Sequence, residues 1–156
     1  MITTRRAHPD DAATAATLLH AFNTEFDAPV PDVPTLTTRF AELLRRDDIL
    51  IWFAIDGDRP FGFALVTLRP SVYFDGPLAQ LEELYVEPQS RGRGAGQQMV
   101  AAMTAELVRR DHGEIHINVD EVDDGARRFY ERHGFTNFES NGSRMLCYVR
   151  DVITTA

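Results

Sequence analysis

A short glycine-rich segment at residues 91–96 contains the residue types that most directly indicate chemistry. It reads Arg-Gly-Arg-Gly-Ala-Gly and lies between an expected strand that ends at Glu87-Pro88 and an amphipathic segment. Glycines leave backbone amides uncovered, and the N-terminus of a helix carries a partial positive charge, so such a segment can bind a phosphate or pyrophosphate. A P-loop would end in Gly-Lys-Ser/Thr, and a dinucleotide-binding loop would need glycine at Gln97; neither pattern is met. The alternative is a strand-to-helix turn that binds nothing.

The elements around this segment determine how it is positioned. Residues 78–86 have the composition of a strand, and residues 94–110 that of a helix whose apolar side chains share one face. Gly113 breaks the chain before a strand at 114–119. A strand-helix-strand unit within one sheet requires a right-handed crossover, which makes its two strands parallel.

The rest of the chain predicts further short strands and helices. An Asp-Gly-Asp turn joins a hairpin at 49–56 and 60–68. Three prolines in residues 25–34 exclude a continuous helix, so we expect an ordered loop that buries Phe26 and Val30. The other expected elements are strands at 1–7, 135–139 and 144–149 and helices at 9–23, 35–46 and 123–133. The order β-α-α-β-β-β-α-β-α-β-β predicts an α/β (α+β) fold with a mixed, mostly antiparallel sheet and flanking helices.

Composition limits the class of protein. The chain has 156 residues and a net charge of −8, so we expect one domain over residues 1–156 and no nucleic-acid partner, since a phosphate backbone requires a cationic surface. A single cysteine, Cys147, excludes an intrachain disulfide, and no apolar run approaches the ~18 residues of a membrane span. We therefore expect a cytoplasmic protein without a membrane partner. His112, His116 and His133 lack the spacing of metal ligands, so no metal is expected.

Three segments in this order resemble the GNAT superfamily of acetyl-coenzyme A-dependent N-acetyltransferases. The family signature Arg/Gln-x-x-Gly-x-Gly/Ala is matched by Arg91, Gly94 and Gly96. The likeness extends to Leu-Glu-Glu-Leu-Tyr-Val-Glu-Pro at 81–88 and to Ala-Arg-Arg-Phe-Tyr-Glu-Arg-His-Gly-Phe at 126–135. It implies a single-domain GNAT-like fold with a splayed parallel central strand pair, acetyl-CoA as the cofactor and coenzyme A as the product.

The resemblance also implies which residues contact the coenzyme. The backbone amides of residues 92–96 would hold the pyrophosphate, and the strand at 84–86 would pair with the pantetheine arm. Ala126 would leave room for the coenzyme, whereas Asp123, where many members have Asn, either weakens a contact or only caps the helix. The full set expected to contact the coenzyme is Leu84, Tyr85, Val86, Arg91, Gly92, Arg93, Gly94, Ala95, Gly96, Asp123, Ala126, Phe129 and Tyr130.

Acetyl transfer to an amine requires a base, because an alkyl ammonium has a pKa of about 10 and must lose a proton before it attacks. Adjacent strand residues point to opposite faces, so only one of Glu82 and Glu83 is expected to face the cleft. By resemblance Glu82 is the first candidate, acting through water, and Glu83 the second; the alternative for either is a solvated strand carboxylate. Tyr130 is expected to protonate or stabilise the leaving thiolate, unless it is a core tyrosine, and the amide of Val86 to polarise the acetyl carbonyl.

The acceptor is expected to lie beside the connection between the first two helices, which lines the acceptor side in the family. Here that connection carries carboxylates and an aromatic ring, which suit an ammonium ion by charge and by cation–π contact; solvated loop charges are the alternative. Tyr73, with its neighbours Phe74 and Asp75, precedes the strand at 78–86 and is expected to close the same cleft. The residues expected to bind the acceptor are Glu25, Phe26, Asp27, Tyr73 and Glu82.

Together these features predict an N-acetyltransferase that moves an acetyl group from acetyl-CoA to a primary amine of a small cationic molecule by direct attack in a ternary complex. Two alternatives stay open, a protein or peptide N-acetyltransferase and a non-catalytic acyl-CoA-binding sensor. An acyl-Cys intermediate at Cys147 would need a paired base that the sequence does not identify, so Cys147, like Trp52, is expected in the core. A homodimer is expected only by analogy with the family.

Overall fold

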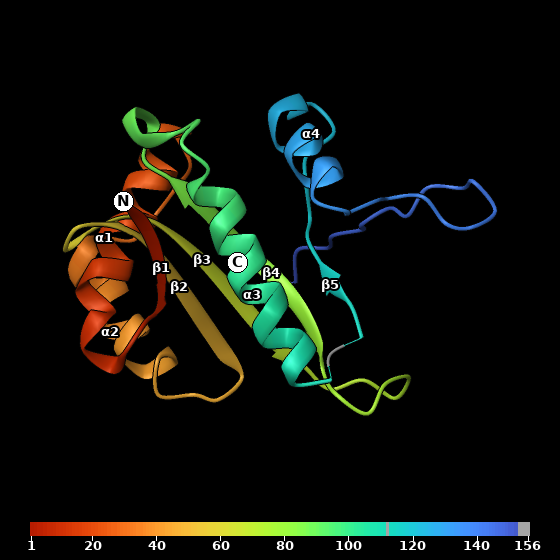
Figure 1. Ribbon diagram of the computed structural model, residues 1–156, viewed down its shortest axis with the longest axis horizontal. Helices are drawn as coiled ribbons and strands as arrows, with labels where there is room; N and C mark the ends of the chain where they lie inside the picture. The colour runs from red at the N-terminus through yellow and green to blue at the C-terminus, as the bar shows by residue number, and fades with distance from the viewer. Residues whose placement is uncertain (112, 153–156) are drawn as a thin grey trace. The chain divides into compact units, whose positions relative to one another are not determined.

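The computed structural model describes residues 1–111 and 113–152 (Figure 1). His112 lies outside the described residues. The chain forms two compact units, residues 1–117 and residues 118–156. No helix in the described part of the chain has the length and apolar character needed to cross a membrane.

The first unit is built on a five-stranded sheet in the order β1-β2-β3-β4-β5. Its strands are β1 (Ile2–Arg6), β2 (Ile49–Asp56), β3 (Arg59–Arg69), β4 (Leu78–Val86) and β5 (Ile115–His116). Neighbouring strands pair antiparallel, except that β4 and β5 pair parallel. The mixed, mostly antiparallel sheet is therefore confirmed.

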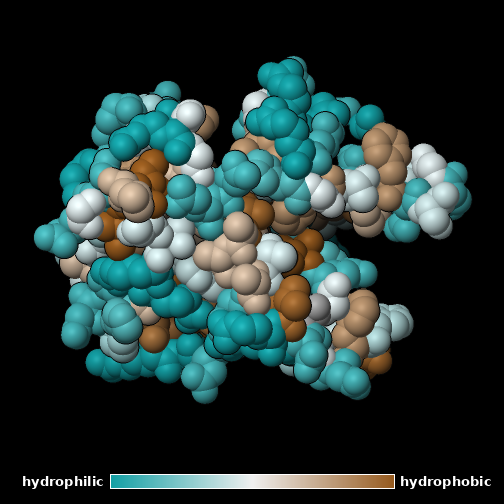
Figure 2. Space-filling view, in the orientation of Figure 1, coloured by the Kyte–Doolittle hydropathy of each residue, from teal (hydrophilic) through white to brown (hydrophobic). Residues whose placement is uncertain are grey.

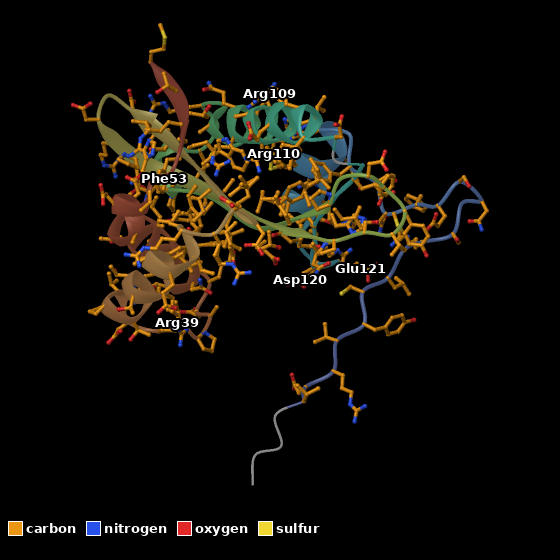
Figure 3. The ribbon with its side chains drawn as sticks, turned by 90° about the horizontal axis from the view of Figure 1, so that it is seen from below. Arg39, Phe53, Arg109, Arg110, Asp120 and Glu121 are labelled. Carbon is orange, nitrogen blue, oxygen red and sulfur yellow. The ribbon has the colours of Figure 1, made fainter. Side chains whose placement is uncertain are left out.

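Helices cover both faces of this sheet. α1 (Ala12–Glu25) and α2 (Val33–Leu43) pack on one face, and α3 (Ala95–Arg109) packs on the other. Figure 3 shows the sheet between them, with Arg39 of α2 and Arg109 of α3 on opposite sides. In the following we call the face under the first two helices the α1–α2 face. This α/β arrangement is the predicted fold class.

The core follows the alternation of the central strands. Ile51 and Phe53 of β2 belong to a buried cluster shared with α1 and α2. Trp52, expected in the core, is buried. Met103 and Leu107 are buried on the inner side of α3, as their helical spacing predicts. On the face that Figure 2 shows, hydrophilic side chains predominate over scattered apolar ones.

Side chains that follow β1 fix the start of α1. A 3₁₀ turn at Pro9–Asp11 occupies the predicted start of this helix and leads into α1. The Asp11 carboxylate accepts a hydrogen bond from the backbone N–H of His8 at 2.7 Å and two from the Arg5 guanidinium at 2.7 and 2.8 Å. The hydrogen bond from Arg5 holds the pKa of Asp11 below its ordinary value. β1 and α1 are thereby joined by a charged contact.

The segment between α1 and α2 is a loop, as its prolines predict. The following helix begins slightly earlier than expected, because Asp32 caps it and Pro34 occupies its first turn. Phe26 was expected to be buried, but it is 58% exposed. It is the C-cap residue of α1, so its ring packs edge-on against Phe22, one turn earlier, and stays at the surface.

β5 is shorter than the predicted strand at 114–119. Only Ile115 and His116 pair with β4, opposite Ala79 and Gln80. Beyond these residues β4 continues to its end without a strand on that side in the described chain. β4 and β5 are thus paired only over their first residues in the described chain, in agreement with the splayed parallel pair that the resemblance implies.

The second unit begins at Asn118 and contains α4 (Asp124–Arg132). Gly134 has φ = 87° and follows the C-cap of this helix, next to the end predicted at residue 133. The N–H of Phe135 donates to the C=O of Tyr130 at 3.0 Å, a bond typical of such a helix end.

The two last predicted strands, 135–139 and 144–149, are wrong. The structure has a single antiparallel bridge there, between Phe138 and Arg144. Strand-forming residue types favour an extended backbone, but a strand also needs a paired neighbour, and that pairing is limited to the turn. Cys147, expected in the core of the last strand, is consequently exposed.

Candidate active site

A β-bulge in β4 brings two glutamates together. Leu65 of β3 pairs with Glu83, whereas the next residue, Val66, pairs with Leu81. Glu82 is therefore the extra residue of β4, and it shares with Glu83 the position opposite Leu65. Such a bulge interrupts the regular alternation of side chains along a strand.

The bulge overturns the expectation that Glu82 and Glu83 point to opposite faces. Tyr85, two residues after Glu83, belongs to the buried cluster under α1 and α2. Oε1 of Glu82 accepts a hydrogen bond from Oγ1 of Thr67 at 2.6 Å. Thr67 shares its side of β3 with Leu65, which packs against the same cluster. Both carboxylates thus lie on the α1–α2 face.

The two carboxylates have different surroundings. Glu82 is exposed, whereas Glu83 is half-buried and has no hydrogen-bond partner among the described residues. Burial raises the pKa of Glu83, and the charge of Glu82 raises it further. A base works best when its pKa lies near the working pH, so Glu83 is the better suited of the two to accept a proton.

The end of β4 offers backbone groups on the edge away from β3. The N–H of Glu87 donates to the C=O of Phe61 at 2.9 Å, so the N–H groups of Leu84 and Val86 point away from β3. The C=O of Val86 accepts a hydrogen bond from Nε of Arg91 at 2.9 Å. An extended arm that carries amides can pair with such an edge.

The glycine-rich segment forms an exposed loop between β4 and α3. A short 3₁₀ turn, Pro88–Ser90, leads into it, and Gly94 is the N-cap of the helix. Gly92 and Gly94 have φ of 75° and 83°, a left-handed conformation that favours glycine. Among the described residues, no side chain caps the first amides of α3, and a Cβ at either glycine would meet nothing within 4 Å. The loop therefore fits an anion such as a pyrophosphate.

The side chain of Arg91 joins this loop to α1. Its Nη1 and Nη2 donate to Oε1 and Oε2 of Glu25 at 2.8 and 2.7 Å, and its guanidinium lies 5.9 Å from the ring centroid of Tyr85. Tyr85 in turn stacks on Phe22 of α1 at 5.0 Å. Arg91, which was expected to contact the coenzyme, thus forms an ion pair with Glu25, which was expected to bind the acceptor. Sequence reasoning missed this pair because its members are 66 residues apart.

Arg93 is held by the turn between β2 and β3. Its Nη2 donates to Oδ2 of Asp56 at 2.7 Å, and its guanidinium lies 6.0 Å from the ring centroid of Phe61. The hydrogen bond from Arg93 and the nearby amino group of Met1 lower the pKa of Asp56. Both arginines of the loop are therefore anchored by carboxylates.

The other residues expected on the acceptor side lie in two separate places. Phe26 and Asp27 directly follow α1 and are exposed, as is Tyr73 in the connection between β3 and β4. The backbone N–H of Tyr73 donates to Oγ of Ser71 at 3.1 Å. Within the described chain its ring makes no aromatic or hydrogen-bond contact with the α1 residues.

The expected coenzyme residues of α4 belong to the second unit. Oδ1 of Asp123 accepts a hydrogen bond from the N–H of Ala126 at 2.8 Å, so Asp123 does cap the helix. Tyr130 is buried, and its ring contacts those of Phe129 and Phe135 edge-on at 5.2 and 5.4 Å. Ala126, Phe129 and Tyr130 are spaced three and four residues apart and so share one face of α4.

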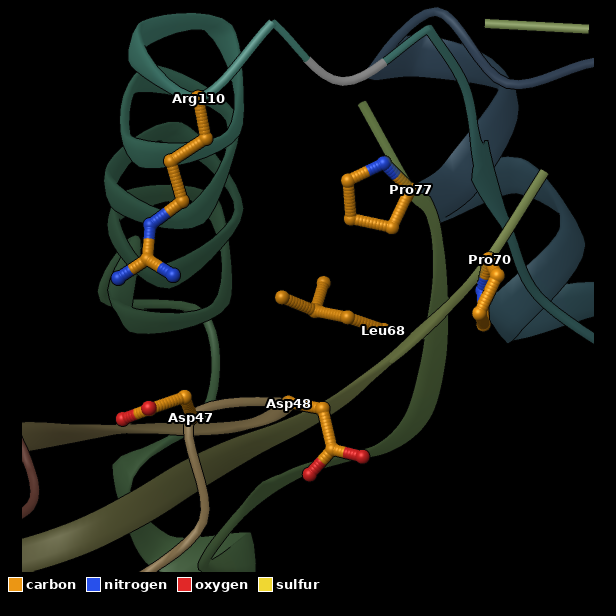
Figure 4. Close-up of a pocket in the computed structure, with 6 residues that line it drawn as sticks. All are labelled: Asp47, Asp48, Leu68, Pro70, Pro77 and Arg110. Atoms are coloured by element: carbon orange, nitrogen blue, oxygen red, sulfur yellow. The ribbon is translucent and has the colours of Figure 1, made fainter. Parts of the chain in front are cut away.

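A surface cavity of about 430 Å³ lies at the C-terminal end of α3, the end away from the glycine loop (Figure 4). The side chain of Arg110 points toward Asp47 and Asp48 across it. It contains none of the residues predicted to bind the coenzyme or the acceptor. Nowhere in residues 1–111 and 113–152 do three or more histidine, cysteine or acidic side chains gather as metal ligands.

The sequence matches the acetyltransferase (GNAT) family model over residues 15–135, a span that contains the glutamate pair, the glycine loop and α4. The chain belongs to the acetyltransferase (GNAT) family. It is therefore an acyltransferase of the N-acetyltransferase class, and members of this family in general use acetyl-CoA.

The names of individual proteins that this chain resembles agree with this family assignment. A crystal structure from Arthrobacter sp. FB24 that carries the name of an acetyltransferase is 46% identical, with a TM-score of 0.89 over 96% of each chain. A mycothiol acetyltransferase of Thermobispora bispora is 36% identical over 64 residues, which are 41% of this chain but only 22% of that protein. An aminoglycoside acetyltransferase from an uncultured soil metagenomic sample, solved with trehalose, is 18% identical with a TM-score of 0.81 over 98% and 97% of the chains, which shows the fold alone.

Proposed function

We propose that this protein transfers the acetyl group of acetyl-CoA to a primary amine of a small cationic molecule, by direct attack in a ternary complex. The observation that carries the proposal is the arrangement of β4. Its bulge presents two carboxylates on the α1–α2 face, and its end leads into the glycine loop. One strand thus offers a site for an ammonium and a site for a pyrophosphate.

The described residues fit acetyl-CoA. The left-handed glycines and the uncapped start of α3 suit the pyrophosphate, and the outward amides of Leu84 and Val86 suit the amides of pantetheine. The bound coenzyme supplies an activated thioester. Asp123, Ala126 and Phe129 of the second unit are proposed as further contacts.

The glutamate pair removes the proton that makes an ammonium unreactive. The half-buried position and raised pKa of Glu83 support it as the proton acceptor, with the exposed Glu82 beside it. Tyr130 is proposed to stabilise the leaving sulfur, and the amide of Val86 to polarise the acetyl carbonyl. These last two roles rest on the family resemblance.

A cationic acceptor is supported by the charges around the site. Asp27 follows α1, Glu82 lies exposed on β4, and the whole chain carries a net charge of −8, whereas the charge of Glu25 is paired with Arg91. Attraction by fixed carboxylates would raise the local concentration of a polyamine or an aminoglycoside. We further propose that residues 1–156 work as one acetyltransferase domain, because the family match crosses the boundary between the two units. We also propose the cytoplasm as the compartment of the protein.

A screen of acceptors tests this function. Purified protein and acetyl-CoA are mixed with spermidine, sisomicin, single amino acids or lysine peptides, and free thiol is measured over time. We expect amine-dependent release of thiol with a polyamine or an aminoglycoside, and slower release with neutral or peptide acceptors. Titration calorimetry that detects no binding of acetyl-CoA at millimolar concentration would refute the proposal.

A further inference from the structure

We propose that Thr67 is a positioning residue of the acetyl-transfer site: its hydroxyl anchors the Glu82 carboxylate beside Glu83, so that Glu82 receives the charge of the acceptor ammonium while Glu83 takes its proton. The inference rests on the proposed function and divides the work between the two carboxylates. In the proton step an N–H bond of the ammonium breaks and an O–H bond forms on Glu83. The free amine keeps the electron pair with which it attacks.

The contact between Thr67 and Glu82 is short and well defined. Oγ1 of Thr67 donates to Oε1 of Glu82 at 2.6 Å, the range of a charge-assisted O–H···O⁻ bond. Threonine is β-branched, so its hydroxyl has few positions available. Glu82 is otherwise exposed and sits at the irregular point of the strand, where nothing else in the described chain holds its carboxylate.

The bulge makes this anchor necessary. In a regular strand Glu82 would point to the face opposite Glu83, and Thr67 could not reach it. The extra residue turns Glu82 to the side of Thr67, so that both carboxylates face the same region. Without an anchor, the exposed Glu82 carboxylate would move away from the like charge of Glu83. The hydroxyl keeps one of them in place.

Charged groups of β3, β5 and α1 near this site are held in contacts of their own. Arg69 of β3 lies 2.9 Å, through Nη2, from Nδ1 of His116 on β5. Nε2 of His116 lies 2.7 Å from a carboxylate oxygen of Glu114. From α1, Glu25 is paired with Arg91. The helix α3 packs on the opposite face.

Glu82 is therefore the charged neighbour that acts on Glu83. Burial is the larger cause of the raised pKa of Glu83, and the charge of Glu82 is the smaller one. If the Glu82 carboxylate loses its anchor and moves away, the smaller cause weakens and the pKa of Glu83 falls. This fall in the pKa of Glu83 can be measured without knowing which amine is the acceptor.

The test compares Thr67→Val with Thr67→Ser. Valine keeps the branched shape and removes the hydroxyl, whereas serine keeps the hydroxyl and removes the methyl group. Carbon-13 NMR of the labelled glutamate carboxyls gives the titration midpoint of Glu83 in each protein. Thr38→Val is the matched control, because it removes an exposed hydroxyl that bonds only to the C=O of Pro34 on α2.

We expect the midpoint of Glu83 to shift to lower pH in Thr67→Val and to return in Thr67→Ser, with the control unchanged. With the fastest amine of the acceptor screen, KM for the amine should rise roughly tenfold in Thr67→Val, the effect of losing a hydrogen bond to a charged group. The acid limb of kcat/KM should move to lower pH.

Equal midpoints in wild type and Thr67→Val, or equal defects in the valine and serine variants, would overturn the role of Thr67. Failure of the proposed function has a different signature. In that case the wild type would show no amine-dependent thiol release with any acceptor of the screen, while the NMR midpoints would still report whether Thr67 anchors Glu82.

Discussion

Glu83 is the residue on which the proposed chemistry depends most. Its carboxylate is half-buried and lies beside a second carboxylate. Glu83→Gln keeps the size of the side chain and removes the proton acceptor. We predict that kcat for acetyl transfer falls roughly a hundredfold or more, the typical contribution of a general base, while KM for acetyl-CoA stays the same.

Steady-state kinetics with both substrates varied measures this effect. Glu42→Gln is the control, because Glu42 is an exposed residue of α2 outside the site. A loss of activity of the same size in Glu42→Gln, or full activity in Glu83→Gln, would contradict the assignment.

The pH dependence of the reaction follows from the same residue. Glu83 is active when deprotonated, so kcat/KM should rise with pH through a pKa above the ordinary glutamate value of about 4.3. Glu82→Gln removes the smaller cause of the raised pKa and should shift the acid limb to lower pH, although burial keeps it above the ordinary value. An acid limb that is identical in both proteins would argue against Glu83 as the base.

For individual residues, the sequence predicted which residue types belong to the site but not which contacts they make with one another. The two glutamates could be singled out because residues 81–88 resemble the corresponding segment of the family. Their common face could not, since it depends on one extra residue in the register between β3 and β4. The pair of Arg91 with Glu25 likewise depends on tertiary packing.

The glycine loop is the element that the coenzyme requires most. Gly94 has φ = 83°, and alanine there would be strained by about 1–2 kcal/mol although no atom obstructs its Cβ. We predict that Gly94→Ala raises the Kd of acetyl-CoA roughly tenfold, because relief of the strain moves the amides at the start of α3. Titration calorimetry measures this change.

Gly142→Ala is the matched control, because Gly142 has the same φ of 83°, equally open space and a place in the last turn of the chain. It should lower the unfolding temperature similarly and leave the Kd unchanged. Equal Kd values in Gly94→Ala and wild type would show that the loop amides do not bind the coenzyme.

The start of α1 makes a separate prediction about stability. Arg5 and the His8 amide hold Asp11 in its ionised form, and the Arg5 contact lowers its pKa. Asp11→Ala should reduce the free energy of unfolding by about 1–2 kcal/mol at pH 7. Because the folded pKa is depressed, this stabilisation is present above the unfolded pKa of about 3.9 and is lost as pH falls through the lower folded value.

Urea unfolding of both proteins between pH 7 and pH 3 measures this difference. The difference between the two stabilities should shrink towards the acid end. A difference that is constant over the whole range would show that the contact acts by packing and not by charge.

The elements themselves were predictable where their signals are local. β2 and β4 were predicted with their observed bounds, because each has the composition of a strand and ends at residues typical of a turn. β5 and the last two strands were not, because the length of a strand depends on a partner that its own sequence does not specify.

The charge of the whole molecule makes a prediction about the acceptor. With a net charge of −8, the protein should attract a cationic amine over a distance that salt shortens. KM for a polyamine should therefore rise severalfold between 0.05 and 0.5 M salt, roughly as the Debye length falls. KM values of a neutral amine serve as the comparison, and equal salt dependence for both amines would contradict a cationic acceptor.

The central claim is that the protein moves an acetyl group from acetyl-CoA to an amine at the β4 carboxylates. Mass spectrometry of the acceptor, combined with thiol measurement in the same reaction, tests it most directly. We predict one acetylated amine for each thiol released by the wild type and almost none of either with Glu83→Gln. Thiol release without acetylated amine, or equal acetylation by both proteins, would contradict the claim.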